Sequence, residues 1–463
     1  MKKFASVAEL NAALDGIVAR QGDGVKVLDA DRLRATLMDP LVYNAVFAAT
    51  AEVRGTARHL IRQIGIATGC VPASIHDFYM AMGRGEVAPM TVPAINIRGI
   101  SYDTARAIVR ASQKLNSGAF VFEIAKSEIA YTFQRPAEYA VVMLAACIRE
   151  GHTGPVFIQG DHYQVNAKKY AKDPEAALEE VRALIRESVP VGFYNIDIDT
   201  STLVDLSRPT VKQQQERNYR HAAELTALVR GLEPAGVTVS VGGEIGEVGE
   251  QNSTVEEYEA YQQGYNELLP KGMAGISKVS VQTGTSHGGT PNADGSVAEV
   301  ALDFAVLKDI SAVARGKFGI SGTVQHGAST LPDDCFHRFV ANDASEVHLA
   351  TGFQNMIYDS RHLPQDLLND VYDWLRQNCA DEQKPGQTEA QFLYKTRKKG
   401  FGPFRERFWT LPDATRAAIG QELEDKFHFL FGQLGVKNSK AAIDKHVKLV
   451  NVRPDLKTEI ASA

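Results

Sequence analysis

The chain has 463 residues, enough for one large domain with appended segments. Of these residues 44% are hydrophobic and 23% are charged, as in ordinary globular proteins, and the formal net charge is -6. The negative charge argues against a nucleic-acid partner. The sequence contains no run of about 18 apolar residues, so no membrane span is predicted. We expect residues 6–20 to form a surface helix rather than a secretory signal, because no apolar segment follows the two N-terminal lysines.

The predicted elements divide the chain into three parts. Residues 1–88 are expected to form an N-terminal helical region, because apolar residues recur at helical spacing between residues 28 and 66. Residues 359–463 are predicted to form a helical C-terminal extension. Its basic run has the pattern of a solvated helix end more than that of a phosphate site, and consists of Lys395, Arg397, Lys398 and Lys399.

Between these parts, over residues 89–358, eight short apolar runs alternate with helical patterns. The runs are residues 90–96, 119–124, 155–159, 192–197, 237–241, 276–283, 318–325 and 346–350. Such alternation implies parallel strands joined by right-handed crossovers. Eight such units predict an α/β protein with a closed (β/α)8 TIM barrel.

Histidines from three separate strand ends predict a metal site at one mouth of this barrel. They are His162, His287 and His326. Three imidazoles and one open position are typical of catalytic Zn²⁺, although the same ligands accept other divalent transition metals. Glu244 follows another strand; it could bind the same ion, bind a second position, hold a histidine, or simply serve as an N-cap or loop carboxylate.

Several carboxylates near these histidines are candidates for proton transfer. Asp161 directly precedes His162, where it could act as general acid/base or instead cap a helix or orient a ligand. Asp197 and Asp199 share one strand face, so we expect one of them near the metal or its ligands. Glu250 lies in a polar loop that either closes over the site or is a plain connector.

Small polar loops after the last three strands are candidates for a phosphate site. They span residues 288–290, 327–330 and 351–352. Backbone N–H groups from such loops commonly bind phosphate in barrels, although turns also need glycine for conformational reasons. The four cysteines are far apart and form no C-x-x-C pair, which favours a reducing cytoplasm and argues against thiolate ligands.

Four of these motifs together resemble the class II, metal-dependent ketose-bisphosphate aldolases. The motifs are Asp161-His162, Glu244-Ile245-Gly246, Gly284-Thr285-Ser286-His287-Gly288-Gly289 and Gln325-His326-Gly327-Ala328-Ser329, and Pro93-Ala94-Ile95-Asn96 is similar to the first strand of that family. Strand eight departs from the pattern, because it reads His348-Leu349-Ala350-Thr351-Gly352 where the family has an Asn-x-Asp-Thr-Asp-like stretch.

The resemblance implies a role for each matching residue. Zinc would be bound by His162, His287 and His326, with Glu244 as the ligand of an alternative metal position. Asp161 would be the acid/base acting on the C4 hydroxyl. Phosphate and a monovalent cation would be held by residues that include Gly288, Gly327 and Ser329, with Thr351 as a further phosphate contact and Asn96 at the substrate.

These observations predict a lyase that cleaves a phosphorylated ketose by a reversible aldol reaction through a metal-stabilised enediolate, with Glu250 reprotonating the carbon. We expect a cytoplasmic enzyme of carbohydrate metabolism such as glycolysis, with a small phosphorylated sugar as partner, no nucleic acid and no membrane, and a homodimer or higher homo-oligomer. Three alternatives stay open: a Schiff-base aldolase using Lys278, a metal-dependent sugar or sugar-acid epimerase, and a non-catalytic aldolase-like subunit.

Overall fold

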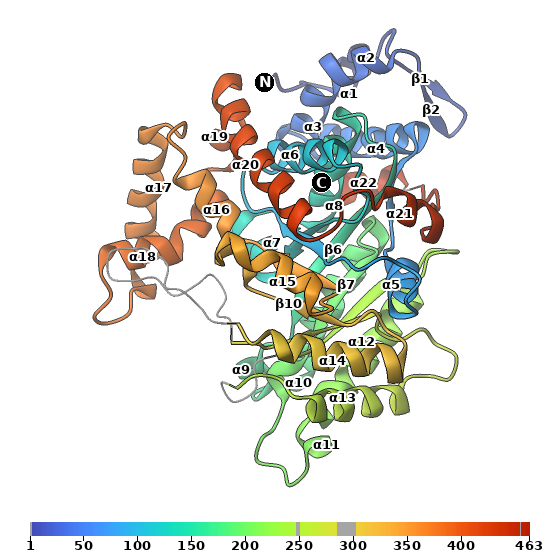
Figure 1. The fold of residues 1–463 in the computed structure, drawn as a ribbon. Helices are drawn as coiled ribbons and strands as arrows, with labels where there is room; N and C mark the ends of the chain where they lie inside the picture. Colours follow the sequence, from blue (N-terminus) through green and yellow to red (C-terminus); the bar gives the residue numbers. More distant parts are fainter. Residues whose placement is uncertain (1, 247–250, 285–301, 454) are drawn as a thin grey trace.

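The structure is a computed structural model that describes residues 2–246, 251–284, 302–453 and 455–463 (Figure 1). Eight parallel strands form a closed ring at its centre. They are β4 (Val92–Asn96), β5 (Val121–Ala125), β6 (Gly154–Gln164), β7 (Asn195–Asp199), β8 (Ser240–Gly246), β9 (Lys278–Val281), β10 (Thr323–Gln325) and β11 (Glu346–Leu349). The ring closes because β11 pairs with β4 and β6 pairs with β7, which confirms the predicted (β/α)8 TIM barrel.

Helices cover the outer face of this ring, and the inner face of each strand is enclosed within the barrel. The main ones are α6 (Ser101–Lys114), α8 (Pro136–Arg149), α10 (Pro174–Ser188), α12 (Glu216–Leu232), α13 (Val255–Leu268), α14 (Phe304–Phe318), α15 (Phe336–Ala341) and α16 (Thr351–Tyr358). Every residue of β4, β5 and β7 is buried. Burial on both faces explains why the strands appear in the sequence as short apolar runs rather than as alternating patterns.

The N-terminal region is helical apart from three short strands. Its longest helix is α4 (Ala51–Thr68), which follows α3 (Met38–Phe47). Strands β1 (Val18–Gln21) and β2 (Gly24–Val27) form an antiparallel hairpin that the helical prediction missed, with Gly22 at a φ of 56° in its turn. Strand β3 (Cys70–Ala73) pairs with the first residues of β6, outside the ring.

The C-terminal extension returns to the N-terminal region and to the barrel. It contains α17 (Gln365–Asn378), α18 (Glu389–Thr396), the 3-10 helix η7 (Arg397–Phe401), α19 (Arg405–Trp409), α20 (Asp413–Gln433), α21 (Lys440–His446) and α22 (Leu456–Ala461). Helix α20 packs against α6, and α22 packs against α4, where Arg62 Nε lies 2.6 Å from Glu459 Oε1. Figure 1 shows these blue and red elements on the same side of the barrel. The division into three domains stays a prediction, and among the described residues no helix combines the length and apolar character that a bilayer span requires.

Candidate active site

An irregularity in β6 brings two adjacent polar side chains into one site. Neighbouring residues of a regular strand point to opposite faces. The pairing of β6 with β7 shifts register between Gly160 and Tyr163, and His162 has a φ of 43°. Left-handed backbone is uncommon for histidine and clusters at functional sites. The shift lets both Asp161 and His162 line the same cavity. Because Asp161 lies within β6, it does not cap the next helix.

His162, Glu244 and His326 converge from three strand ends on one point. One potential ligand atom from each lies within 4.8 Å of the others. The ring centroids of His162 and His326 are 4.2 Å apart, and Glu244 Oε2 lies 3.3 Å from His162 Nδ1. Glu244 belongs to β8, so it is neither an N-cap nor a loop carboxylate. This oxygen is buried and has no hydrogen-bond partner among the described residues, as suits a metal ligand.

The electrostatics of this cluster favour a bound cation. Burial lowers the pKa of His162, but the charges of Asp161 and Glu244 outweigh it and raise the pKa well above its usual value. Burial, together with the charge of Asp199, raises the pKa of Glu244 to about 7. Asp199 Oδ2 also lies 3.2 Å from His162 Nδ1, where it orients the ring. The carboxylates around His162 favour its protonated form, and a divalent ion bound by the cluster would balance the same negative charge.

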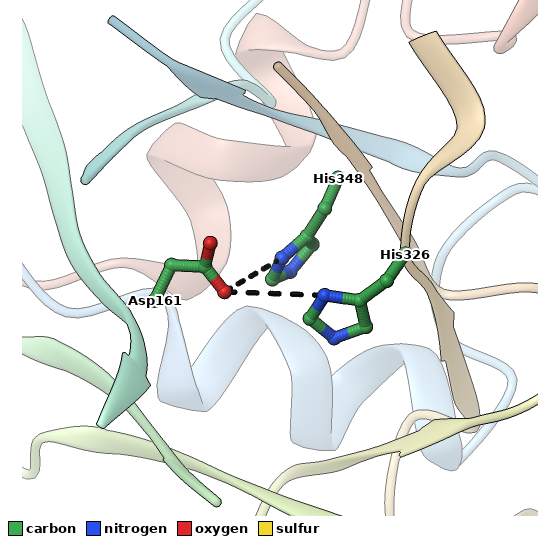
Figure 2. Close-up of side chains that lie close together, drawn as sticks. All are labelled: Asp161, His326 and His348. Atoms are coloured by element: carbon green, nitrogen blue, oxygen red, sulfur yellow. Dashed lines mark hydrogen bonds and ion pairs between the residues drawn. The ribbon is translucent and has the colours of Figure 1, made fainter. Parts of the chain in front are cut away.

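His348 of β11 joins this site, although its sequence context indicates only a departure from the family pattern. Its ring centroid lies 4.1 Å from that of His326, and its Nδ1 lies 3.2 Å from Asp161 Oδ1. Figure 2 shows Asp161 facing both rings. One potential ligand atom from each of Asp161, His326 and His348 also lies within 4.8 Å of the others. The alternation of Glu346 and His348 on a buried strand was the signal that could have indicated an inward-facing polar pair.

Asp161 is held as an ionised carboxylate. Burial raises its pKa, but the charges of His162 and His348, with a hydrogen bond from His348, hold the pKa well below the usual value. Asn96 Nδ2 donates to Asp161 Oδ2 at 2.9 Å and to Glu128 Oε2 at 2.9 Å. Asn96 therefore fixes the orientation of the carboxylate, in addition to lining the cavity as a predicted substrate contact.

A cavity of about 520 Å³ collects most of the predicted site residues that the structure describes. Its lining includes Asp161, His162 and His326, and also Asn96, Gly327, Ser329 and Thr351. Glu244 lies behind this lining and touches His162. The predicted ligand His287, the loop acid Glu250 and the phosphate contact Gly288 lie outside the described residues.

The two described phosphate-loop candidates pack directly against each other. Ser329 Oγ accepts a hydrogen bond of 3.0 Å from the backbone N–H of Gly352. A Cβ at Gly352 would collide with the carbonyl oxygen of Ser329, so only glycine allows this approach. Thr351 Oγ1 accepts a hydrogen bond of 3.1 Å from Arg98 Nη1. The predicted loop at residues 351–352 is instead the first turn of α16, and this turn forms one polar wall of the cavity together with the segment after β10.

Lys278 belongs to a separate buried network beneath the cavity. Its Nζ donates to Gln159 Oε1 at 2.8 Å and to Asp197 Oδ2 at 3.0 Å, and it pairs with Glu346. Burial lowers the pKa of Lys278, but Asp197 and Glu346 raise it above its usual value. A charged, fully buried amine outside the cavity lining does not suit a Schiff-base nucleophile, which needs the neutral form.

Comparison with known proteins points to one family. Residues 84–397 match the family described as fructose-bisphosphate aldolase class-II. A probable tagatose 6 phosphate kinase from Sinorhizobium meliloti 1021 is 18% identical with a TM-score of 0.51, over 80% of this chain and 96% of that one. A fructose-bisphosphate aldolase from Campylobacter jejuni is 17% identical with a TM-score of 0.46, over 80% of this chain and 97% of that one.

A fructuronate-tagaturonate epimerase from Cohnella laeviribosi is 12% identical with a TM-score of 0.49, over 94% of this chain and 90% of that one. No curated protein matches the chain.

Proposed function

Because the chain belongs to the class II fructose-bisphosphate aldolase family, we propose that it is a metal-dependent lyase that cleaves a phosphorylated ketose by a reversible aldol reaction. The observation that carries this proposal is the convergence of Asp161, His162 and His326 at one cavity, with Glu244 in contact with His162. Carboxylate and imidazoles from different strands at one barrel mouth suit metal-assisted proton transfer.

The metal in this proposal is Zn²⁺ or another divalent transition ion. His162 and His326 would hold it, with Glu244 and, from outside the described residues, His287. Both described histidines have buried partners that fix their rings, Asp199 for His162 and Ser280 for His326, whose Nε2 lies 2.8 Å from Ser280 Oγ. When bound, such an ion supplies Lewis-acid stabilisation of the negative charge that forms at the ketose carbonyl.

Asp161 is the proposed general base in the cleavage direction. Its carboxylate takes the proton of the hydroxyl on the carbon beyond the bond that breaks, and returns it during condensation. The low pKa of Asp161 keeps it ionised in the ground state. Asn96 and His348 hold its two oxygens, so the carboxylate does not rotate away from the cavity. Glu250 would supply the proton to the carbon of the ketone fragment.

The sugar's phosphate would lie against Gly327 and Ser329 after β10 and against Thr351 in the first turn of α16, with Gly288 and a monovalent cation completing the site. A cavity of about 520 Å³ is within the size range of small-molecule sites. Location in the cytoplasm and assembly into a homo-oligomer stay predictions, and size-exclusion chromatography with light scattering tests the second.

A metal-dependent epimerase acting on a sugar or sugar acid is the second candidate. The observation that favours it is the sequence in and after β11, where His348 stands in place of the asparagine of the aldolases, and Ala350 and Gly352 stand in place of the two aspartates. This replacement changes the groups that face the substrate beside Asp161 but leaves the proposed metal ligands in place.

One experiment separates these candidates. The purified protein is analysed for metal and incubated with a panel of ketose phosphates and keturonates, and the products are identified by mass spectrometry and NMR. Stoichiometric divalent metal and two smaller products support the aldolase, whereas an isomer of unchanged mass supports the epimerase. His326→Ala should lose both metal and activity, and the exposed His337 provides the matched control His337→Ala. A metal-replete protein that converts no sugar in the panel would overturn the proposal.

A further inference from the structure

The fold assigns different positions to the four cations of the basic run. The expectation of a solvated helix end is wrong for two of them. Arg397 is buried and donates to Asp359 Oδ1 and Asn355 Oδ1, each at 2.6 Å. Lys398 lines the cavity, and among the described residues no carboxylate lies within ion-pair distance of its ammonium. Lys399 pairs with Glu382, and Lys395 is exposed.

Close packing holds Lys398 at the cavity wall. Segment η7 lies against α7 (Lys126–Thr132), and the rings of Phe401 and Tyr358 are 4.7 Å apart. A Cβ at Gly99 would collide with the Phe401 ring, and a Cβ at Gly402 would collide with the carbonyl oxygen of Tyr131. Two glycines therefore allow the C-terminal extension to approach the barrel mouth closely. The packing of η7 against α7 therefore fixes the place of Lys398 beside the cavity.

Arg98 supplies a second cation on the same wall. It follows β4, and its Nε donates to Glu128 Oε1 at 2.6 Å while its Nη1 donates to Gln354 Oε1 at 2.8 Å and to Thr351 Oγ1. These bonds orient the guanidinium, which also lines the cavity. Lys398 is close enough to Arg98 that burial and the charge of Arg98 together lower the lysine pKa.

The charges on this wall do not balance. Glu128 is the one carboxylate that pairs with Arg98 among the described residues, and it also accepts hydrogen bonds from Asn96 Nδ2 and from the backbone N–H of Ala125. Lys398 makes no such ion pair among the described residues; its Nζ lies over the ring of Tyr131, 5.7 Å from the ring centroid. One positive charge is thus left over at a concave, partly buried surface, which an anion would neutralise.

We propose that Arg98 and Lys398 form an anion-binding subsite that takes the phosphate or carboxylate group at one end of the sugar substrate. That the anion belongs to a sugar substrate rests on the proposed function, whereas binding of an anion by Arg98 and Lys398 does not. A planar guanidinium beside an ammonium binds either oxyanion through charge-assisted hydrogen bonds. The subsite adjoins Thr351, so the C-terminal extension contributes directly to substrate choice through Lys398.

The test measures binding without turnover. Inorganic phosphate and gluconate are each titrated calorimetrically at low ionic strength into the purified protein and into three variants. Lys398→Met keeps the length of the side chain and removes its charge, and should weaken at least one probe by about tenfold in Kd. Lys398→Arg should restore most of the affinity. Lys399→Met, next in sequence but paired with Glu382, should leave both Kd values within about twofold of the wild type.

The two probes identify the source of the anion. Weakening of phosphate alone assigns a phosphate group, weakening of gluconate alone assigns a carboxylate, and weakening of both assigns a general oxyanion site. The inference is overturned if wild type binds neither probe, or if Lys398→Met binds both as tightly as wild type does. A protein that shows the Lys398 effect but cleaves no ketose phosphate would retain the subsite and lose the aldolase proposal, so the two failures are distinguishable.

Discussion

Two clusters of carboxylates and histidines lie one above the other inside the same barrel, and they differ in how their negative charge is balanced. The upper cluster contains Asp161, Asp199 and Glu244, and its described ion-pair partners are histidines alone. The lower cluster contains Glu123, Asp197 and Glu346, and the last two pair with Lys278. His348 touches both, with Nδ1 near Asp161 Oδ1 and Nε2 2.6 Å from Glu346 Oε1.

The difference separates a site from a structural network made of the same residue types. Lys278 offsets part of the negative charge of the lower cluster, and removing the lysine leaves more of that charge uncompensated. A carboxylate cluster with only imidazoles for partners can accept a cation from solution. The lower cluster lies outside the lining of the cavity, whereas Asp161 and His162 form part of that lining. Charge balance, more than residue type, thus distinguishes the proposed metal site.

The largest effect expected is on catalysis, from Asp161→Asn in the upper cluster. The amide keeps the shape of the side chain but cannot accept the substrate proton, so kcat should fall by about 10³-fold on the substrate that the panel identifies. Metal content measured by mass spectrometry should stay at the wild-type level when His162, Glu244 and His326 hold the ion, whereas loss of metal would place the ion at Asp161, His326 and His348. Wild-type turnover in this variant would remove Asp161 from the mechanism.

The lower cluster should respond in stability. Lys278→Met leaves Asp197 and Glu346 buried without their cation, and should lower the free energy of unfolding by about 3–5 kcal/mol in urea titrations. The exposed Lys271 offers the control Lys271→Met, which should change stability by less than about 0.5 kcal/mol.

Trapping tests the same lysine chemically. Borohydride added with substrate should label no lysine in the wild-type protein, because Lys278 is buried and charged. A reduced adduct on Lys278 would place this residue in catalysis and reverse the assignment of the two clusters.

The barrel could be predicted from the sequence because its strands are buried on both faces and therefore form short apolar runs separated by helical patterns. Each of the eight predicted runs overlaps a strand of the ring. The β1–β2 hairpin was missed because Gly22 and Asp23, the two residues between its paired strands, also suit a break between two helices. A break between helices and a tight turn use the same residues.

The candidate site was less predictable where it depends on three-dimensional contacts. His162 adopts a left-handed backbone that no neighbouring glycine indicates. His348 stands in a strand whose sequence departs from the family, so the resemblance pointed away from it. Lys398 belongs to a basic run typical of solvent-exposed helix ends, and the fold alone places one of its four members in the cavity. Local patterns predict elements, but these three positions follow from how distant elements pack.

The pH dependence of the metal-free protein sharpens the comparison further. Glu244 has a pKa of about 7 in the folded protein, above its usual value of 4.5. The folded state therefore holds this proton to higher pH than the unfolded chain, and stability falls as pH rises between those values. Glu244→Gln removes the effect, so the variant should match wild type near pH 5 and exceed it by roughly 2–3 kcal/mol above pH 7.

Thermal or urea unfolding in the presence of a chelator measures this difference across the pH range. Added zinc should reverse the order at pH 7.5, because the ion stabilises the ionised carboxylate of the wild type and the glutamine is a weaker ligand. A difference between the two proteins that does not change with pH would mean that Glu244 is not the titrating group.

The smallest effect concerns how the upper cluster is held for its ion. Ser280 extends from β9 beside Lys278, and its Oγ lies 2.8 Å from His326 Nε2. Ser280→Ala removes the partner that orients the ring, and should raise the Kd for zinc by about tenfold in competition with a chromophoric chelator. Ser277 is also buried in the barrel but bonds to Ser240 instead, so Ser277→Ala should leave zinc affinity unchanged. Equal affinities in the two variants would show that His326 does not need this bond to bind metal. In that case, packing against the rings of His162 and His348 would be what positions the His326 ring.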